Sequence, residues 1–171
     1  SSICVASRCP WVRAGVGAAS TQNITDPSLG NEMLDLIAKG SNPEQAIQMV
    51  TKGRQFIDYR QLSVIDIKGR SASFTGSETL GTNAVFRGDD CIAAGNLLVS
   101  NEVPQSMVDS FSKHSNLHLA ERLLLALQAG LDAGGEEGPV HSAGIKVAHE
   151  HSWPLVDLRV DWADEKPIDQ L

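Results

Sequence analysis

The chain has 171 residues, of which 42% are hydrophobic and 20% charged, a balance typical of a folded globular protein and unlike that of a disordered chain. A formal net charge of −7 argues against nucleic acid or an anionic membrane surface as the main partner, and no apolar run approaches the length of a membrane span. Three cysteines, an odd number without metal-type spacing, fit a reduced, cytoplasmic protein better than a disulfide framework.

The N-terminal segment combines a possible nucleophile with two apolar stretches. Residues 3–6 and 12–20 have the composition of β-strands, and Pro10 predicts a corner between them. Ser1 carries a hydroxyl beside a free α-amino group. Because that amine titrates near neutral pH, it can accept the hydroxyl proton, so Ser1 is a candidate catalytic nucleophile.

Two helices are predicted next. Asp26 has the chemistry of an N-cap and Pro27 that of a first helical residue, while Gly40 marks the end of this helix. The second helix begins at once, because Ser41 and Glu44 have the spacing of a capping box. Two short helices in tandem predict a layer that covers one face of a sheet.

The rest of the chain alternates strands with a second pair of helices. The patterns predict strands at 61–66, 71–75, 91–94, 142–148 and 155–161, helices beginning at Pro104 and covering 119–131, and a loop at 79–90. Strands outnumber those of a simple βαβ repeat, and the helices come in pairs. This order favours an α+β fold of two stacked sheets with a helical layer on each outer face.

Polar side chains that follow buried strands are the candidates for binding. Gly95 and Asn96 end a short apolar strand, and alternation in 155–161 places Asp157 and Arg159 on one face. For residues 21–23 and 95–96 the alternative to a binding role is ordinary turn chemistry. For Asp157 and Arg159 the alternative is a solvated edge or an ion-pair ladder. The substrate-binding candidates are Thr21, Gln22, Asn23, Glu78, Asp157 and Arg159.

Signatures of cofactor and metal enzymes are missing from the sequence. It contains no P-loop, no dinucleotide-binding fingerprint and neither a GxSxG nor an HExxH motif. The five histidines lack the spacing of a metal site, which disfavours a metal-dependent hydrolase. We therefore expect no cofactor and no metal.

Several segments resemble a bacterial domain-of-unknown-function family, numbered one-zero-two-eight, that is placed with the N-terminal nucleophile (Ntn) hydrolase-like proteins. The resemblance covers nearly the whole chain and is carried by residues 10–18, 21–22, 60–64, 74–76, 94–96, 119–124, 138–143 and 156–161. It implies a single domain over residues 1–171 with a four-layer αββα sandwich. It implies no established substrate.

The chain departs from the family pattern at both ends. Members usually begin with an extra β-hairpin ahead of the position of Ser1, and the usual C-terminal extension beyond Leu171 is shortened here. If processing releases Ser1, this residue takes the place of an Ntn nucleophile. If the chain is trimmed, Ser1 belongs to the interior of a strand and the nucleophile lies upstream.

The resemblance implies an amidohydrolase that acts on a small amide substrate. Ser1 would attack the carbonyl, Asn96 would donate to the oxyanion with Gln22 as a second choice, and Arg13 would orient the amine or bind a substrate carboxylate. We expect a homo-oligomer that binds neither nucleic acid nor membrane. The alternative is a catalytically silent metabolite-binding or oligomeric αββα domain.

Overall fold

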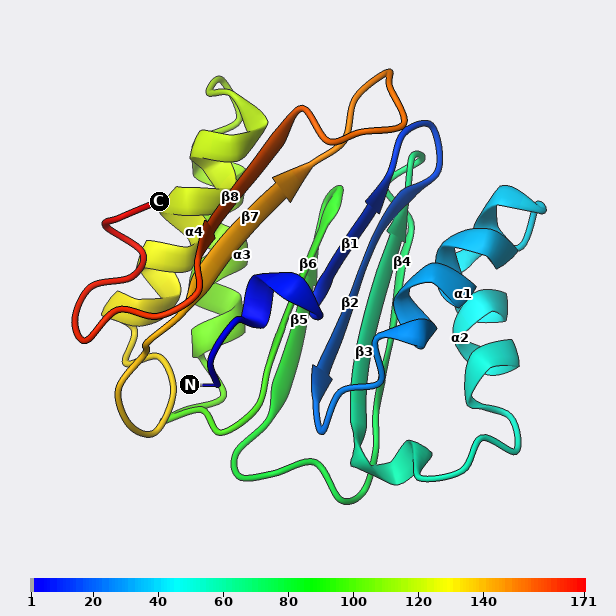
Figure 1. Ribbon diagram of the computed structural model, residues 1–171, viewed down its shortest axis with the longest axis horizontal. Coiled ribbons are helices and arrows are strands. Elements are labelled where there is room, and N and C mark those ends of the chain that lie inside the picture. Colours follow the sequence, from blue (N-terminus) through cyan, green and yellow to red (C-terminus); the bar gives the residue numbers. More distant parts are fainter. Residues whose placement is uncertain (1) are drawn as a thin grey trace.

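The computed structural model of the chain describes residues 2–171, with helices and antiparallel strands in alternating groups (Figure 1). The first half contains a 3-10 turn η1 (Val5–Ser7), β1 (Pro10–Arg13), β2 (Gly17–Asn23), α1 (Ser28–Ala38), α2 (Pro43–Thr51), a 3-10 turn η2 (Ile57–Tyr59), β3 (Arg60–Asp66) and β4 (Ser71–Thr75). The second half contains β5 (Ala84–Gly88), β6 (Cys91–Gly95), α3 (Val103–Lys113), α4 (Leu119–Asp132), β7 (Ala143–Val147) and β8 (Val156–Val160).

Strands β1 to β4 form one antiparallel sheet in sequence order. Each strand therefore pairs with its neighbour in the chain, with short turns between β1 and β2 and between β3 and β4, and with α1 and α2 between β2 and β3. Gln61 of β3 lies opposite Gln22 of β2 on one side and opposite Thr75 of β4 on the other. Residues of such a row point to the same face of the sheet, and neighbouring rows point to opposite faces.

Helices α1 and α2 cover one face of this sheet (Figure 1). Alternate strand residues meet the apolar stripes of both helices and form the main core, which leaves the polar rows of the strands for the opposite face. The buried members of this core are Ala19, Leu29, Met33, Leu34, Ile47, Val50, Leu62, Val64 and Ala72.

The other face of the sheet meets two separate hairpins, β5–β6 and β7–β8. Strand β6 packs against β3, and β7 packs against β1. Helices α3 and α4 pack against each other, with α3 on β5 and β6 and α4 on β7. Figure 1 shows the two helical pairs on opposite sides of the strands, which confirms the α+β class.

The predictions for the first strands were wrong in detail. Residues 3–6 do not form a strand, because Cys4 adopts a left-handed conformation and the chain then turns through η1. Residues 12–20 form no single strand either, since a turn with Gly15 at φ 70° divides them into parts of β1 and β2.

Two further local expectations are corrected. The 79–90 segment predicted as a loop contains β5, whose Arg87 lies opposite Ile92 of β6. The capping box of α2 is one residue later than predicted, with Asn42 as N-cap and Gln45 as its partner.

No helix within residues 2–171 is long and apolar enough to cross a membrane.

Candidate functional site

Three side-chain amides, those of Gln22, Gln61 and Asn96, meet between the β1–β4 sheet and the end of β6. We call them the amide cluster. Gln61 is fully buried, and its Nε2 donates to the Gly95 carbonyl at 3.0 Å. Its Oε1 accepts a hydrogen bond from Asn96 Nδ2 at 3.2 Å, and Gln22 Nε2 donates to the Ala94 carbonyl at 3.3 Å.

The amide cluster follows from strand alternation. Thr21 and Leu62 are paired and buried on the side of the helices, so the next pair, Gln22 and Gln61, points toward β6. Two long amide side chains then satisfy carbonyls at the end of β6, because buried polar groups require such partners. Two of the three members, Gln22 and Asn96, are residues that the sequence proposed for oxyanion binding.

Asn23 and Glu78 lie at the same end of the sheet. Asn23 has φ 67°, and its Nδ2 donates to the Tyr59 carbonyl at 2.6 Å while its Oδ1 accepts from the Leu80 N–H at 3.3 Å. Glu78 is exposed, and its N–H donates to the Asp58 carbonyl at 2.8 Å. Both residues are thereby anchored to the adjacent turn, Asp58 to Tyr59.

Thr21 and Arg13 belong to the opposite face. The Thr21 hydroxyl donates to the Arg8 carbonyl at 3.0 Å and accepts from the Thr25 hydroxyl at 2.8 Å. Arg13 Nη1 pairs with the Asp35 carboxylate of α1 at 2.6 Å. The structure therefore does not bring Arg13 to the amide cluster.

Asp157 and Arg159 are on β8, away from the amide cluster. Both are exposed, with Lys146 Nζ at 3.5 Å from the Asp157 carboxylate and Arg159 Nη2 at 3.3 Å from the Asp161 carboxylate. The candidate nucleophile Ser1 lies outside the described residues.

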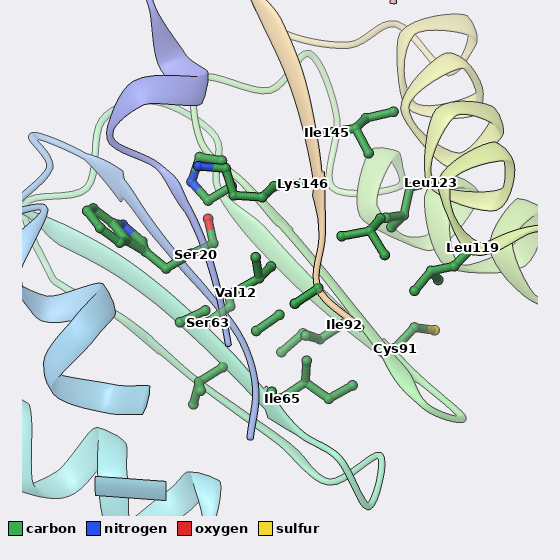
Figure 2. Close-up of a pocket in the computed structure, with 18 of the residues that line it drawn as sticks. Val12, Ser20, Ser63, Ile65, Cys91, Ile92, Leu119, Leu123, Ile145 and Lys146 are labelled. Atoms are coloured by element: carbon green, nitrogen blue, oxygen red, sulfur yellow. The ribbon is translucent and has the colours of Figure 1, made fainter. Parts of the chain in front are cut away.

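A cavity of about 540 Å³ lies between the β1–β4 sheet, β6, β7 and the helices α3 and α4, and Gln22, Gln61 and Asn96 are not among the residues that line it. Figure 2 shows apolar side chains of the two layers converging on it, with Ser20 and Ser63 on the sheet side. Ser63 is 6% exposed, and its Oγ has no hydrogen-bond partner among the described residues. Labelled lining residues are Val12, Ile65, Cys91, Ile92, Leu119, Leu123, Ile145 and Lys146.

The cysteines near this region do not have the properties of nucleophiles. Burial raises the pKa of the Cys9 thiol, and burial also raises the pKa of the Cys91 thiol. Both thiols are therefore protonated at neutral pH, whereas the thiolate is the reactive form. Among residues 2–171 no three side chains of histidine, cysteine, aspartate or glutamate gather as metal ligands would.

Gln61 is the member of the amide cluster that the sequence analysis missed. The signal was a glutamine in a predicted strand, one position before the buried Leu62. Alternation alone would have placed Gln61 on the face away from the helices. Its partners could not be inferred, because they come from β6, which is more than 30 residues further along the chain.

The chain belongs to a family of unknown function, DUF1028, whose model matches residues 1–171. A protein of Silicibacter pomeroyi assigned to the same family has a crystal structure that is similar to this chain, with a TM-score of 0.91 and 34% sequence identity. The similarity covers 99% of this chain and 73% of that one. No curated protein matches the chain.

Proposed function

We propose that this chain is an Ntn hydrolase-like αββα domain that hydrolyses the C–N bond of a small amide substrate. The order of layers supports the fold: α1 and α2, the β1–β4 sheet, the two hairpins, then α3 and α4. The amide cluster between the two β-layers is the observation that carries the function, because the partly buried amide N–H groups of Gln22 and Asn96 are suitable donors to an oxyanion.

The proposed reaction begins at an N-terminal hydroxyl, for which Ser1 is the candidate. Its oxygen attacks the substrate carbonyl carbon, while the α-amine accepts the hydroxyl proton and then passes it to the leaving amine. The C–N bond breaks and leaves an ester on Ser1, which water hydrolyses to release the acid. No redox partner or metal is needed for this sequence of bonds.

Asn96 and Gln22 are the proposed donors to the oxyanion. Each amide nitrogen carries two hydrogens, and the bonds to Gln61 and to the Ala94 carbonyl use one hydrogen on each. The second hydrogen remains for substrate. Gln61 acts as a positioning residue because it holds Asn96, and Asn23 and Glu78 are proposed to bind polar groups of the substrate at the same end.

We also propose that additional strands complete the second β-layer. Strand β5 lies over β4, as the bond from Arg87 to the Ser73 hydroxyl at 3.2 Å indicates, β6 lies over β3, and β7 over β1. Within the described residues no strand lies over β2, and the cavity occupies that position. A β-hairpin ahead of residue 1 would fill it if the natural chain continues upstream, and in that case the nucleophile belongs to the hairpin and not to Ser1. Roughly a quarter of the Silicibacter pomeroyi chain lies outside the similarity.

The first experiment locates the nucleophile. The protein is produced from its gene with any natural upstream codons, and its intact mass is measured together with turnover on a panel of small amides. If the proposal with Ser1 holds, the mature chain begins at Ser1 and Ser1→Ala lowers kcat roughly a thousand-fold or more. Ser2→Ala is the matched control and retains activity. If the loss follows an upstream Ser or Thr instead, the nucleophile belongs to the hairpin.

The second experiment tests the amide cluster. Removing one oxyanion donor lowers kcat by about 10²–10³ in hydrolases, so Asn96→Ala is expected to do the same with little change in KM. Asn101→Ala, which removes an exposed amide in the turn before α3, is the control. Equal turnover of both variants would remove Asn96 from the mechanism.

The second candidate function is ligand binding without catalysis. The cavity of about 540 Å³ is within the usual range for small-molecule sites. The unpaired Ser63 hydroxyl would accept or donate one hydrogen bond at its floor. Saturable binding of an apolar fluorescent probe that is abolished by Ala18→Phe, in a protein without amidase activity, would favour this function.

A further inference from the structure

Strand β8 has one paired edge and one open edge. It pairs with β7, and in the part of the chain that the structure describes no strand pairs with its other side. Figure 1 shows β8 on the side of β7 away from the β1–β4 sheet. Leu158, at the centre of the strand, is 41% exposed, and both of its neighbours are exposed. An open strand edge is a template for another strand.

The sequence of β8 is complementary to itself. It reads Val, Asp, Leu, Arg, Val from Val156 to Val160. When two copies run antiparallel with their Leu158 residues opposite each other, Asp157 of each lies opposite the partner's Arg159. Val156 lies opposite the partner's Val160. Opposite charges placed across an antiparallel pair are favourable, and like charges are not.

From this complementarity we propose that two copies of the chain associate through β8 into a twofold-symmetric dimer. The two β7–β8 hairpins then join into a four-stranded antiparallel sheet in the order β7, β8, β8, β7. A twofold axis requires one surface to match itself, and the five residues of β8 meet that requirement. The proposal does not rest on the hydrolase function.

The charges select one register. Moving the centre by one residue to Arg159 would place two arginines opposite each other and would pair Asp157 with the partner's Asp161. Moving it to Asp157 would place two aspartates opposite each other. A parallel arrangement would bring equal charges side by side. Only the antiparallel register centred on Leu158 pairs all five residues of β8 without a repulsive contact.

The ion pairs within one copy are compatible with this dimer. Asp157 lies 3.5 Å from Lys146 and Arg159 lies 3.3 Å from Asp161, and all four side chains are at least partly exposed. Exposed ion pairs contribute little to folding and their side chains are free to adjust. In the dimer, Arg159 would lie between Asp161 and the partner's Asp157.

Exposed apolar side chains at the ends of β8 supply the rest of the contact. A stable interface buries about 1,200–2,000 Å² in total, more than five strand residues provide. Trp153 is 64% exposed, Leu155 57% and Trp162 53%, and all three flank the strand. The Asp161 carbonyl already accepts a hydrogen bond from the Cys4 N–H of its own chain at 3.0 Å. The proposed pairing between the two β8 strands therefore ends at Val160.

Sedimentation equilibrium over a range of protein concentrations tests the proposal with charge-swap variants. We expect a monomer–dimer equilibrium for the natural chain and a dissociation constant raised at least about tenfold in Arg159→Asp, because aspartates then face each other. The double variant Asp157→Arg with Arg159→Asp preserves the complementarity and should restore the dimer. A monomer at all concentrations, or a dimer that ignores both changes, would overturn the proposal.

Cysteine cross-linking tests the register. Leu158→Cys places two thiols opposite each other at the twofold axis, whereas Val156→Cys places each thiol opposite a valine. Under mild oxidation we expect a covalent dimer from the first variant and not from the second. The natural chain, with its own three cysteines, measures the background. Equal cross-linking of both variants would contradict the register.

Discussion

At the scale of single residues, Gln61 connects more of the candidate site than any residue that the sequence suggested. Its side chain is fully buried and bonds to the carbonyl of Gly95, the last residue of β6, and to the side chain of Asn96, which follows β6. A buried polar group stabilises the fold only while its partners are present. The position of Asn96 therefore depends on Gln61.

Replacing Gln61 tests this dependence. Gln61→Leu keeps a similar volume but leaves the Gly95 carbonyl and the Asn96 amide without this partner. We expect a loss of about 2–4 kcal/mol in the free energy of unfolding, since each unpaired buried group costs about 1–3 kcal/mol. Urea denaturation measures it, with the exposed Gln105→Leu of α3 as control. Equal stability of the two variants would mean that the amide cluster carries no stabilisation.

Gly30 of α1 offers a second residue-scale prediction. A Cβ at this position would lie 2.1 Å from Cδ1 of the Trp11 ring, which is rigid. At Gly130 of α4 a Cβ would meet the flexible Met107 side chain at 2.9 Å. We expect Gly30→Ala to destabilise by about 1–3 kcal/mol. Gly130→Ala should cost less, because alanine also favours helix by about 1 kcal/mol. The reverse order in thermal unfolding would contradict this.

At the scale of elements, the turn between β3 and β4 depends on one carboxylate. Asp66 Oδ1 accepts the N–H groups of Lys68 and Arg70, and Oδ2 accepts from the Arg70 guanidinium at 2.6 Å. Burial by itself would raise the pKa of Asp66, but the hydrogen bonds from Arg70 and Lys68 outweigh it and lower that pKa below its usual value.

This shift fixes the direction of a pH effect. Folded Asp66 binds its proton less readily than unfolded Asp66, so its stabilisation is complete above about pH 4 and declines as the pH falls through the folded pKa. Asp66→Asn should lower stability at pH 7 and converge with the natural chain toward pH 2. Denaturation curves across this range measure it, with exposed Asp109→Asn as control. A constant difference between the two proteins would contradict the assignment.

The elements that the sequence predicted well are those whose signals are local. The β3–β4 hairpin and α4 were located within one residue, since alternation and helical periodicity do not depend on distant partners. The capping box of α2 was placed one residue early, because Ser41, Asn42, Glu44 and Gln45 all have capping chemistry and only the backbone decides between them.

The candidate site was predictable only in part. Gln22 and Asn96 lie close together because Gln22 is near the C-terminal end of β2 and Asn96 directly follows the C-terminal end of β6. The face of Arg13, in contrast, depends on the turn at Gly15. Strand β5 was not predicted because it is short and lies among turn residues. It is a strand because it pairs with β6, and a local pattern does not show that pairing.

At the scale of the whole molecule, the two halves differ in how their strands are covered. Strand β3 has a partner strand on each side and the main core beneath it, whereas β8 pairs with β7 alone among residues 2–171 and has an exposed surface. Local opening requires less free energy where few apolar contacts are lost. The second half should therefore open more readily than the first.

Hydrogen exchange measures this difference. We expect backbone amides of β8 to exchange faster than those of β3 by at least about an order of magnitude, at protein concentrations where the chain is monomeric. Raising the concentration should slow exchange in β8 while leaving β3 unchanged, if β8 pairs with a second copy. Equal protection of the two strands at low concentration would contradict the expected order of opening.

The placement of the three tryptophans gives the molecule its own optical probes. Trp11 is partly buried, packs against Gly30 and donates its ring N–H to the Arg8 carbonyl at 3.1 Å, so its emission should report the docking of α1 on the sheet. Trp153 and Trp162 are exposed at the ends of β8 and should respond first to iodide quenching. Intrinsic fluorescence can thus follow folding and self-association separately, with no added label.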